Sequence, residues 1–362
     1  MSIKLGEICS FQSGGTPSKN NSEFFDGTIP WVTTTALNGS KIDERNAATW
    51  ITEKAIKESA AKIVPANSIM VGTRVGVGKV AVNTVEMSTS QDIISLIDIN
   101  EERWDKDYLC KFLQSKSDYL NSQARGATIK GIKINVLAEL AVPDISVKEQ
   151  CRISEVLNTV TKLINARQQQ LAKLDELVKA RFVEMFGDPH INSKGFPTKK
   201  GLELFKISNG KAIASSRRFD NGIPAYGGNG ISYHTDDVLC EKDTIVIGRV
   251  GFQSGNVHLA KGPVWVTDNA MYISEIYDND LNLTFLCEMM EHIDFTKYQD
   301  AGDLKKVTQQ PFMEMGYIIP SRKLQNEYIS FVEQTNKLKL SIQNGLNQTE
   351  TLKKILMQQY FG

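Results

Sequence analysis

The chain has 362 residues, of which 41% are hydrophobic and 23% charged, and its 42 basic side chains balance its 42 acidic ones. This is the composition of a globular protein of two or three domains, and a net charge of zero argues against binding nucleic acid through a uniform positive field. No apolar run reaches the ~18 residues of a transmembrane helix, and the N-terminus lacks an apolar signal segment, so we expect a cytoplasmic protein with no membrane partner. The five cysteines include no CxxC pair. We therefore expect a reduced protein with no disulfide framework or zinc site.

Residues 1–145 are predicted to form a first domain that is mixed and rich in strands. Apolar segments at 68–72 and 79–82 flank a glycine-rich turn and are typical of strands, and a short helix is expected near 108–117. The turn at 72–79 superficially resembles a phosphate-binding loop. It lacks the GxxxxGK[ST] spacing, so we interpret it as a glycine hairpin.

A long helix is predicted at 146–187. Its apolar or stem-bearing positions, Arg167 among them, alternate spacings of four and three from Ile153 to Met185, with one slip near the end, which indicates a coiled-coil seam. No proline or glycine occurs from 146 to 186. At about 1.5 Å per residue, ~40 helical residues would span roughly 60 Å.

Residues 188–320 and 321–362 are predicted to repeat this domain and this helix. Strands are expected at 244–248 and 256–259, again around a glycine turn, and a helix is expected at 283–291.

Five matched blocks establish the repeat. The matched segments are 5–14 with 202–210, 27–31 with 222–226, 69–76 with 245–251, 143–153 with 320–329, and 186–187 with 361–362. Ser13 to Arg74 spans 61 residues, whereas Asn209 to Arg249 spans 40, so the first domain holds about 21 additional residues. This difference indicates either loop drift after duplication or two domains that recognise different ligands on a common frame.

The two long helices are expected to pair with each other, because neither would be stable without burying its apolar stripe. Gly345 lies inside the second helix and indicates either a close helix approach or simple drift. A Phe-Gly end precedes the second domain and also closes the chain, which fits a chain that returns to its start. The predicted fold class is α/β (α+β): two mixed, strand-rich domains separated by two long antiparallel coiled-coil helices, in a pseudo-two-fold internal repeat.

The sequence contains no recognisable catalytic pattern. There is no Pro-Pro pair, so the [DNS]PP[YFW] signature of amino-methyltransferases is absent, and the four histidines have no metal-binding spacing. Residues 303–305 have the DxK spacing of metal-dependent nucleases, but no suitable Pro-Asp lies upstream. There is no GxSxG motif. We therefore expect no catalytic, cofactor-binding or metal-binding residues in this chain.

Polar and basic clusters occur at equivalent places in both copies. A glycine-containing basic loop precedes each long helix, at 125–133 and 301–306, where the backbone can approach phosphate and lysine supplies a point charge. An aromatic residue with small donors and acceptors at 31–35, and again at 226–229, is suited to base edges in the major groove. The candidate DNA-binding residues are Thr33, Thr34, Arg74, Lys130, Lys133, Arg217, Arg218, Asn229, Arg249, Lys305 and Lys306. The alternative for each is an ordinary solvated loop.

The order of these motifs resembles the specificity subunits of type I restriction–modification systems over essentially all 362 residues. The resemblance rests on Ile-Pro-Trp at 29–31, Gly-x-Arg-Val-Gly at 72–76, a Gly-Ala-Thr segment before Val-Pro, Glu-Gln-x-x-Ile at 149–153, and Phe-Gly at 186–187. Each motif is weak alone, but their order, repeated with a helix after each domain, is specific. The second copy departs from it, with Ala225-Tyr226 in place of Trp31 and Gln325-Asn326 in place of Glu149-Gln150.

The resemblance implies that 1–145 and 188–320 are target recognition domains, each reading one half of a bipartite, asymmetric DNA sequence, with 146–187 and 321–362 as spacer helices. It implies a non-catalytic subunit of an adenine-N6 DNA methyltransferase and endonuclease complex, which scaffolds two modification subunits and restriction subunits. S-adenosylmethionine, ATP and Mg would be bound by those partners. Two other hypotheses stay open: a coiled-coil scaffold without sequence-specific DNA binding, and a nuclease or methyltransferase in its own right.

Overall fold

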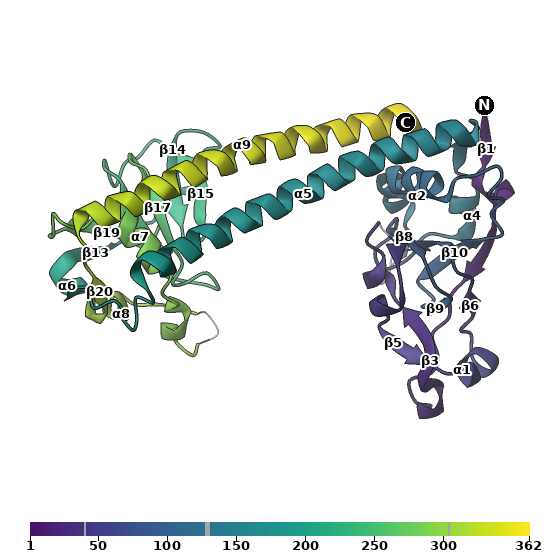
Figure 1. Ribbon diagram of the computed structural model, residues 1–362, viewed down its shortest axis with the longest axis horizontal. Coiled ribbons are helices and arrows are strands. Elements are labelled where there is room, and N and C mark those ends of the chain that lie inside the picture. The colour runs from purple at the N-terminus through teal and green to yellow at the C-terminus, as the bar shows by residue number, and fades with distance from the viewer. Residues whose placement is uncertain (40, 127–130, 303–304) are drawn as a thin grey trace. The chain divides into compact units, whose positions relative to one another are not determined.

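The structure is a computed structural model that describes residues 1–39, 41–126, 131–302 and 305–362 (Figure 1). The chain divides into two compact units: unit 1 is Met1–Gln168 with Gly345–Gly362, and unit 2 is Gln169–Asn344. Two 40-residue helices, α5 (Val147–Phe186) and α9 (Arg322–Phe361), run through this division. Each unit is therefore one globular domain together with a segment of both helices. The division predicted from the sequence was instead into two domains and two separate helices.

Unit 1 contains a five-stranded sheet and a four-stranded sheet. The first has the order β2 (Ser10–Ser13), β10 (Ile93–Ile97), β7 (Ile69–Gly72), β8 (Val80–Asn83), β4 (Lys41–Ile42). The second has the order β5 (Thr49–Ile51), β3 (Phe25–Val32), β9 (Met87–Thr89), β6 (Ile63–Val64). A separate pair joins β1 (Ser2–Lys4) to β11 (Ala141–Pro143). The helices of the domain are α1 (Glu53–Glu58), α2 (Lys106–Ser115), α3 (Ser117–Gln123) and α4 (Ile134–Ala138).

The central strands of unit 1 are buried on both faces, which explains their continuous apolar sequence. Successive side chains of a strand point to opposite faces. Ile69 and Val71 of β7 therefore join the core that includes α2, whereas Met70 joins the core that includes Val32 of the second sheet. The domain is layered as helices, first sheet and second sheet.

Unit 2 repeats this arrangement. Its first sheet has the order β13 (Phe205–Asn209), β19 (Ala270–Ile276), β16 (Thr244–Gly248), β17 (Val257–Ala260). Its second has the order β15 (Gly230–Thr235), β14 (Ile223–Gly227), β18 (Trp265–Val266), and β12 (Thr198–Lys200) pairs with β20 (Gly316–Ile318). The helices are α6 (Gly201–Leu204), α7 (Leu283–Glu291) and α8 (Gln310–Glu314). The predicted strands around both glycine turns and both predicted short helices are confirmed.

Most of the additional residues of the first domain lie between β3 and β7. This segment contributes β4, β5, α1 and β6, whereas the chain between β14 and β16 contributes the single strand β15. The first domain therefore has an additional edge strand in each sheet, β4 in the first and β6 in the second, and its central strands are unchanged.

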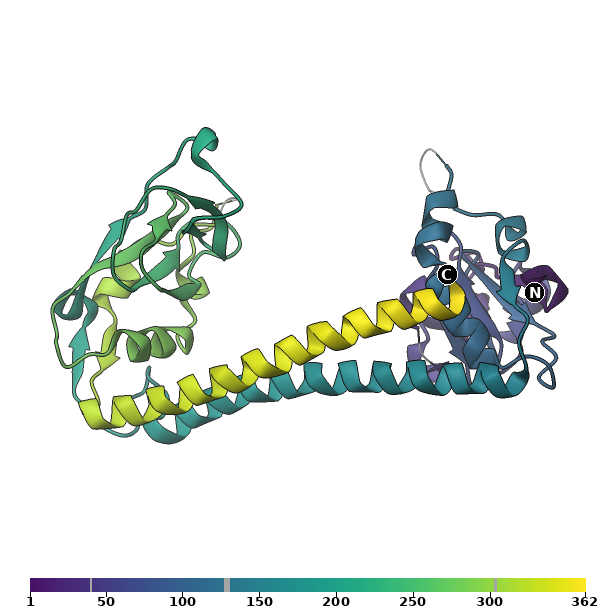
Figure 2. The ribbon, with the colours of Figure 1, turned by 90° about the horizontal axis from the view of Figure 1, so that it is seen from above.

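In unit 1, the beginning of α5 packs antiparallel to the end of α9. Arg167 of α5 donates hydrogen bonds to the Gly345 carbonyl and the Thr349 hydroxyl, and a Cβ at position 345 would lie 2.9 Å from the Arg167 guanidinium. Position 345 is a glycine because the two helices approach closely here, and α9 runs through it without a break (Figure 2). Near the domain, Phe361 of α9 packs 5.2 Å from the ring of Tyr108 in α2.

In unit 2, the end of α5 packs antiparallel to the beginning of α9. Asp175 of α5 pairs with Lys339 of α9 at 2.5 Å. Closer to the domain, Phe186 of α5 lies 4.9 Å from Phe285 of α7 and 5.5 Å from Tyr328 of α9, measured between ring centroids. Each Phe-Gly helix end is therefore anchored in a domain core, as expected for a chain that returns to its first domain.

A buried glutamine near the start of each long helix fixes how the helix leaves its domain. The Gln150 side chain accepts a hydrogen bond from the Asp105 N–H at 2.8 Å and donates to the carbonyls of Arg103 and Ile145. Both this glutamine and its counterpart in unit 2 are completely buried.

Gln325 occupies the same place in unit 2. It accepts from the Asn282 N–H at 2.9 Å and donates to the carbonyls of Asp280 and Pro320. The alignment of Gln325 with Glu149 was therefore wrong by one residue. A fully buried amide must have its hydrogen-bonding groups satisfied. In both copies one backbone N–H and two backbone carbonyls satisfy this glutamine.

Phe361 should be essential for the stability of unit 1. Its side chain is 3% exposed, so Phe361→Ala should lower the free energy of unfolding of unit 1 by about 3–5 kcal/mol, measured by urea denaturation. Ile355→Ala is the matched control, because Ile355 lies on the same helix but is 58% exposed. Equal losses in the two variants would contradict the proposed anchoring role.

An acidic cluster lies where α7 of unit 2 meets the long helices. Partial desolvation, together with the nearby Glu288, raises the pKa of Glu291 to about 7, although its side chain stays accessible to solvent. Burial also raises the pKa of Glu288, whose carboxylate accepts a hydrogen bond from the Tyr328 hydroxyl at 3.1 Å. Asp105 and Asn282 cap α2 and α7 equivalently, so position 291 corresponds to Gln114 of unit 1.

Glu291→Gln should stabilise unit 2 at pH 8 but not at pH 5. An acid whose pKa is higher in the folded than in the unfolded state costs stability as the pH rises from its unfolded pKa through its folded pKa. The penalty is therefore complete above about pH 7. The midpoint of thermal unfolding, measured at both pH values, should rise for the variant at pH 8. An equal rise at pH 5 would point to a cause other than ionisation.

Candidate functional site

In unit 1, a loop and a turn are joined to make one polar site. The turn between β7 and β8 is closed by hydrogen bonds from the Gly72 N–H to the Lys79 carbonyl (2.8 Å) and from the Gly78 N–H to the Gly72 carbonyl (3.0 Å). The Ile132 N–H then donates to the Thr73 carbonyl at 2.8 Å, which fixes the loop that precedes α4 against this turn.

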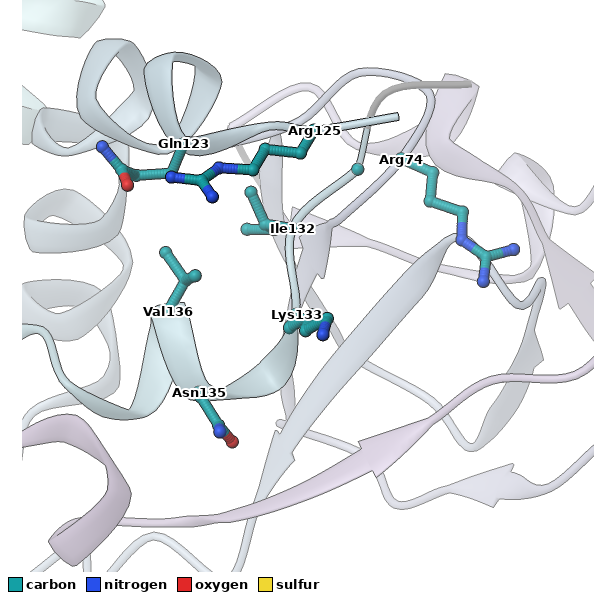
Figure 3. A pocket seen from close by; sticks show the side chains of 8 residues that line it. Arg74, Gln123, Arg125, Ile132, Lys133, Asn135 and Val136 are labelled. Carbon is teal, nitrogen blue, oxygen red and sulfur yellow. The ribbon is translucent and has the colours of Figure 1, made fainter. Parts of the chain in front are cut away.

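This junction brings three cationic side chains to one cavity of about 610 Å³. Arg74 comes from the turn, Arg125 from the beginning of the loop, and Lys133 from the residue that precedes α4. Gln123 and Asn135 add amide groups, and Ile132 and Val136 supply apolar lining. Figure 3 shows Gln123 and Arg125 across the cavity from Asn135 and Val136.

The electrostatics of this cavity favour an anion. Its described lining contains no carboxylate. Arg74 makes only a loose pair with Asp92, at 3.8 Å, and remains about half exposed. Within the described residues, neither Arg125 nor Lys133 has an ion-pair partner. Unpaired cations around amide groups are suited to phosphate oxygens and base edges.

Unit 2 builds its site with the same backbone hydrogen bonds. The Gly248 N–H donates to the Asn256 carbonyl and the Gly255 N–H to the Gly248 carbonyl, each at 2.8 Å. The Val307 N–H donates to the Arg249 carbonyl at 3.0 Å, just as Ile132 does to Thr73 in unit 1.

These bonds correct the alignment of the two turns. Arg249 occupies the backbone position of Thr73, so Arg74 lies one position further along its turn than Arg249 does. Counted from the glycine that begins each turn, Arg74 is the second residue after Gly72, whereas Arg249 is the first residue after Gly248. The two arginines therefore project from different places.

The cavity of unit 2 has a volume of about 560 Å³ and a different lining. Arg218 lies over the ring of Tyr233, with 4.8 Å between the guanidinium carbon and the ring centroid, and donates to the Ile213 carbonyl at 3.2 Å. Asn229 also lines this cavity, together with Asn269. The structure thus brings together the predicted residues Arg218 and Asn229.

Three further basic candidates of unit 2, Arg249, Lys305 and Lys306, flank its turn. Arg249 donates from its side chain to the Asp268 carbonyl at 3.3 Å. The Lys305 carbonyl accepts a bond from the Gly251 N–H at 2.8 Å, and the Lys306 N–H donates to the Asp300 carboxylate at 2.9 Å. Both lysine side chains are exposed.

Three of the predicted site residues are placed differently, and a fourth is not described. Arg217 is paired with Asp236 at 3.0 Å and with Asp237 at 2.7 Å, so its charge is compensated. Thr34 is 5% exposed, so its side chain is not available at the surface. The half-buried Thr33 has its hydroxyl 2.8 Å from that of Thr35. Lys130 lies outside the described residues, as do two residues of the 303–305 segment.

Several lining residues were not predicted from the sequence. In unit 1 they include Gln123, Arg125 and Asn135, and in unit 2 they include Tyr233, Phe252 and Asn269. Arg125 lay inside the predicted basic loop, so a signal existed for it. Tyr233 and Asn269 come from β15 and from the turn before β19, and no spacing in the sequence connects them to the glycine turn.

One tryptophan in each unit makes an equivalent hydrogen bond from a different strand. The Trp31 indole of β3 donates to the Gly15 carbonyl at 3.0 Å, and the Trp265 indole of β18 donates to the Lys211 carbonyl at 3.0 Å. In the two parallel strand pairs, Trp31 lies opposite Ser88 and Trp265 opposite Ala225. The tryptophan therefore lies on neighbouring strands in the two units but makes the same hydrogen bond. Tyr226 does not replace Trp31, and we interpret the indole as a structural anchor.

All five cysteines are free thiols. Within the described residues, no three His, Cys, Asp or Glu side chains are grouped to hold a metal ion. In the same part of the chain, no helix has the length and apolar character needed to cross a membrane.

Known proteins share this sequence and this architecture. The family model described as "Type I restriction modification DNA specificity domain" matches residues 1–176 and 194–350. The type I restriction enzyme MjaIX specificity subunit of Methanocaldococcus jannaschii is 28% identical over 229 residues, which are 57% of this chain and 52%, or about half, of that protein. The EcoprrI specificity subunit of Escherichia coli is 21% identical over 94% of this chain and 88% of its own length.

A solved structure shows the same fold. The type I restriction–modification S subunit from M. genitalium superimposes with a TM-score of 0.64 at 17% identity, covering 100% of this chain and 96% of that one.

Proposed function

Since this chain belongs to the family of type I restriction–modification DNA specificity domains, we propose that it is the sequence-specific DNA-binding subunit of a type I restriction–modification complex. One observation carries the proposal: two copies of one domain build the same turn-and-loop site with the same backbone hydrogen bonds, but line it with different side chains. Two domains that bind two different DNA sequences require this combination of a common backbone arrangement and different side chains at the site.

The target is bipartite and asymmetric in this proposal, with one half bound by each unit. In unit 1, Arg125 and Lys133 supply phosphate contacts, Arg74 supplies a phosphate or guanine contact, and Gln123 and Asn135 supply amides suited to adenine. Unit 2 offers a different set around Arg218, Asn229 and the turn of Arg249, with Lys305 and Lys306 toward the phosphates. The buried Thr34 and the ion-paired Arg217 are the weakest members of the predicted set.

The chemistry belongs to partner subunits in this proposal. Two modification subunits would methylate adenine N6 using S-adenosylmethionine, and restriction subunits would use ATP and Mg. The long helices support a scaffolding role, because they expose apolar side chains that a partner could cover. These include Leu163 and Leu177 on α5 and Leu340 and Ile355 on α9, which are 45% to 63% exposed.

Methylated adenines in the host genome test the proposal directly. The chain is co-expressed with its neighbouring candidate modification subunit, and genomic DNA is sequenced for N6-methyladenine. We expect methylation at one split motif. Exchanging residues 1–144 for those of a relative should change one half of the motif, and exchanging 188–320 should change the other half.

The alternatives have distinct outcomes in this experiment. An intact complex that methylates no motif, and binds no duplex, would favour a coiled-coil scaffold without DNA specificity. Binding of S-adenosylmethionine by the isolated chain would favour a methyltransferase, and we expect no such binding.

Neutralising the cations of the unit 1 cavity should weaken DNA binding without changing the motif. A phosphate contact adds about 0.9 to the slope of log affinity against log salt, so Arg125→Ala and Lys133→Ala should each reduce this slope by about 1. The affinity of the complex is measured by fluorescence anisotropy at several salt concentrations. Lys57→Ala is the control, because Lys57 already pairs with Glu53 on the exposed face of α1. Slopes that match the control would remove this cavity from the DNA interface.

A further inference from the structure

The turn of unit 2 presents a large apolar side chain to solvent. Phe252, between β16 and β17, is 89% exposed, the highest exposure of any aromatic side chain among the described exposed hydrophobics. It follows Gly251, which has a φ of +92° and open space around the position of a Cβ. A free phenyl group here contributes nothing to the core, and its exposure to water is unfavourable.

The surroundings of Phe252 are polar and suited to base edges. Phe252 lines the cavity of unit 2 together with Asn229, Gln253 and Asn269. Arg218 lies in the same lining, and the backbone of Gly251 is bonded to Lys305. Amides that can both donate and accept hydrogen bonds therefore surround one apolar group, with cations and the Asp268 carboxylate beside them.

This combination matches the chemistry of the DNA major groove. Each base pair presents hydrogen-bond donors and acceptors there, and thymine alone adds an apolar group, its C5-methyl. We propose that Phe252 is a specificity-determining residue that packs against the C5-methyl of a thymine in the half-site bound by unit 2. This inference rests on the proposed function and adds to it the chemical identity of one base.

Unit 1 provides an internal comparison. Its turn also carries an exposed apolar residue, Val75, which is 57% exposed and lies next to Gly76. Val75 is smaller than Phe252 and belongs to the other unit, so Val75→Ala is a matched control for effects on the half-site of unit 2.

The test uses the full chain in complex with its modification subunit. Complexes carrying the unchanged chain, Phe252→Ala, Phe252→Leu or Val75→Ala select duplexes from a random library, and the enriched motifs are sequenced. We expect the unchanged chain to require thymine at one position of the half-site that changes when residues 188–320 are exchanged. Phe252→Ala should lose this requirement and keep the other positions, Phe252→Leu should retain it, and Val75→Ala should leave this half-site unchanged.

A second measurement removes the methyl group from the DNA instead of the phenyl group from the protein. Replacing that thymine by uracil should weaken binding of the unchanged complex about 4-fold, the effect of one buried methylene-sized group, and should not affect Phe252→Ala. Because Phe252 is almost fully exposed, the variant should unfold at the same urea concentration as the unchanged chain.

The outcomes separate this inference from the proposed function. If the unchanged complex selects no motif, the proposed function fails and the inference fails with it. If it selects a motif that Phe252→Ala leaves unchanged, or if uracil binds as well as thymine, only the inference is overturned. A variant that keeps the motif but loses a DNA kink, detected by 2-aminopurine fluorescence, would also overturn it and identify Phe252 as a wedge between base pairs.

Discussion

Each long helix carries an apolar stripe that it cannot bury by itself, and the way these stripes are buried organises the molecule. The end of α5 buries Phe186 in the core of unit 2, and the end of α9 buries Phe361 in the core of unit 1. Each helix therefore begins in one domain core and ends in the other. Each domain core therefore contains its own helix start and the helix end contributed by the other copy, so the domains and the helices share their cores.

In each unit, backbone atoms form the frame of the site and side chains form its lining. Hydrogen bonds between backbone atoms hold the loop against the turn in both units, and backbone atoms are common to all residues. Side chains can therefore change without loss of the frame. The tryptophan anchors show the same principle: Trp31 and Trp265 come from different strands, yet each indole donates to the equivalent carbonyl. The charge at the junction of helix and domain also differs, with Glu291 in unit 2 where unit 1 has Gln114.

The sequence alone determined the features that depend on local periodicity and on repetition. Apolar spacings of four and three established the long helices, continuous apolar segments around glycine turns established the central strands, and the repeated order of motifs established two copies of one unit. These predictions succeeded because helix and strand periodicity are set by backbone geometry, which leaves a regular trace in the order of residues. The basic loops could also be predicted from the sequence, because their residues are close together in the chain.

Only the tertiary structure decided which side chains meet. Arg217 looked as available as Arg218, but Asp236 and Asp237, distant in sequence, compensate its charge. Thr34 looked like a surface group but is buried, and Gln325 proved equivalent to Gln150 only through its hydrogen bonds. Tyr233 and Asn269 reach the site of unit 2 because strand pairing brings them there. Burial, ion pairing and register depend on contacts between segments far apart in the chain, and such contacts leave no spacing in the sequence from which they could be predicted.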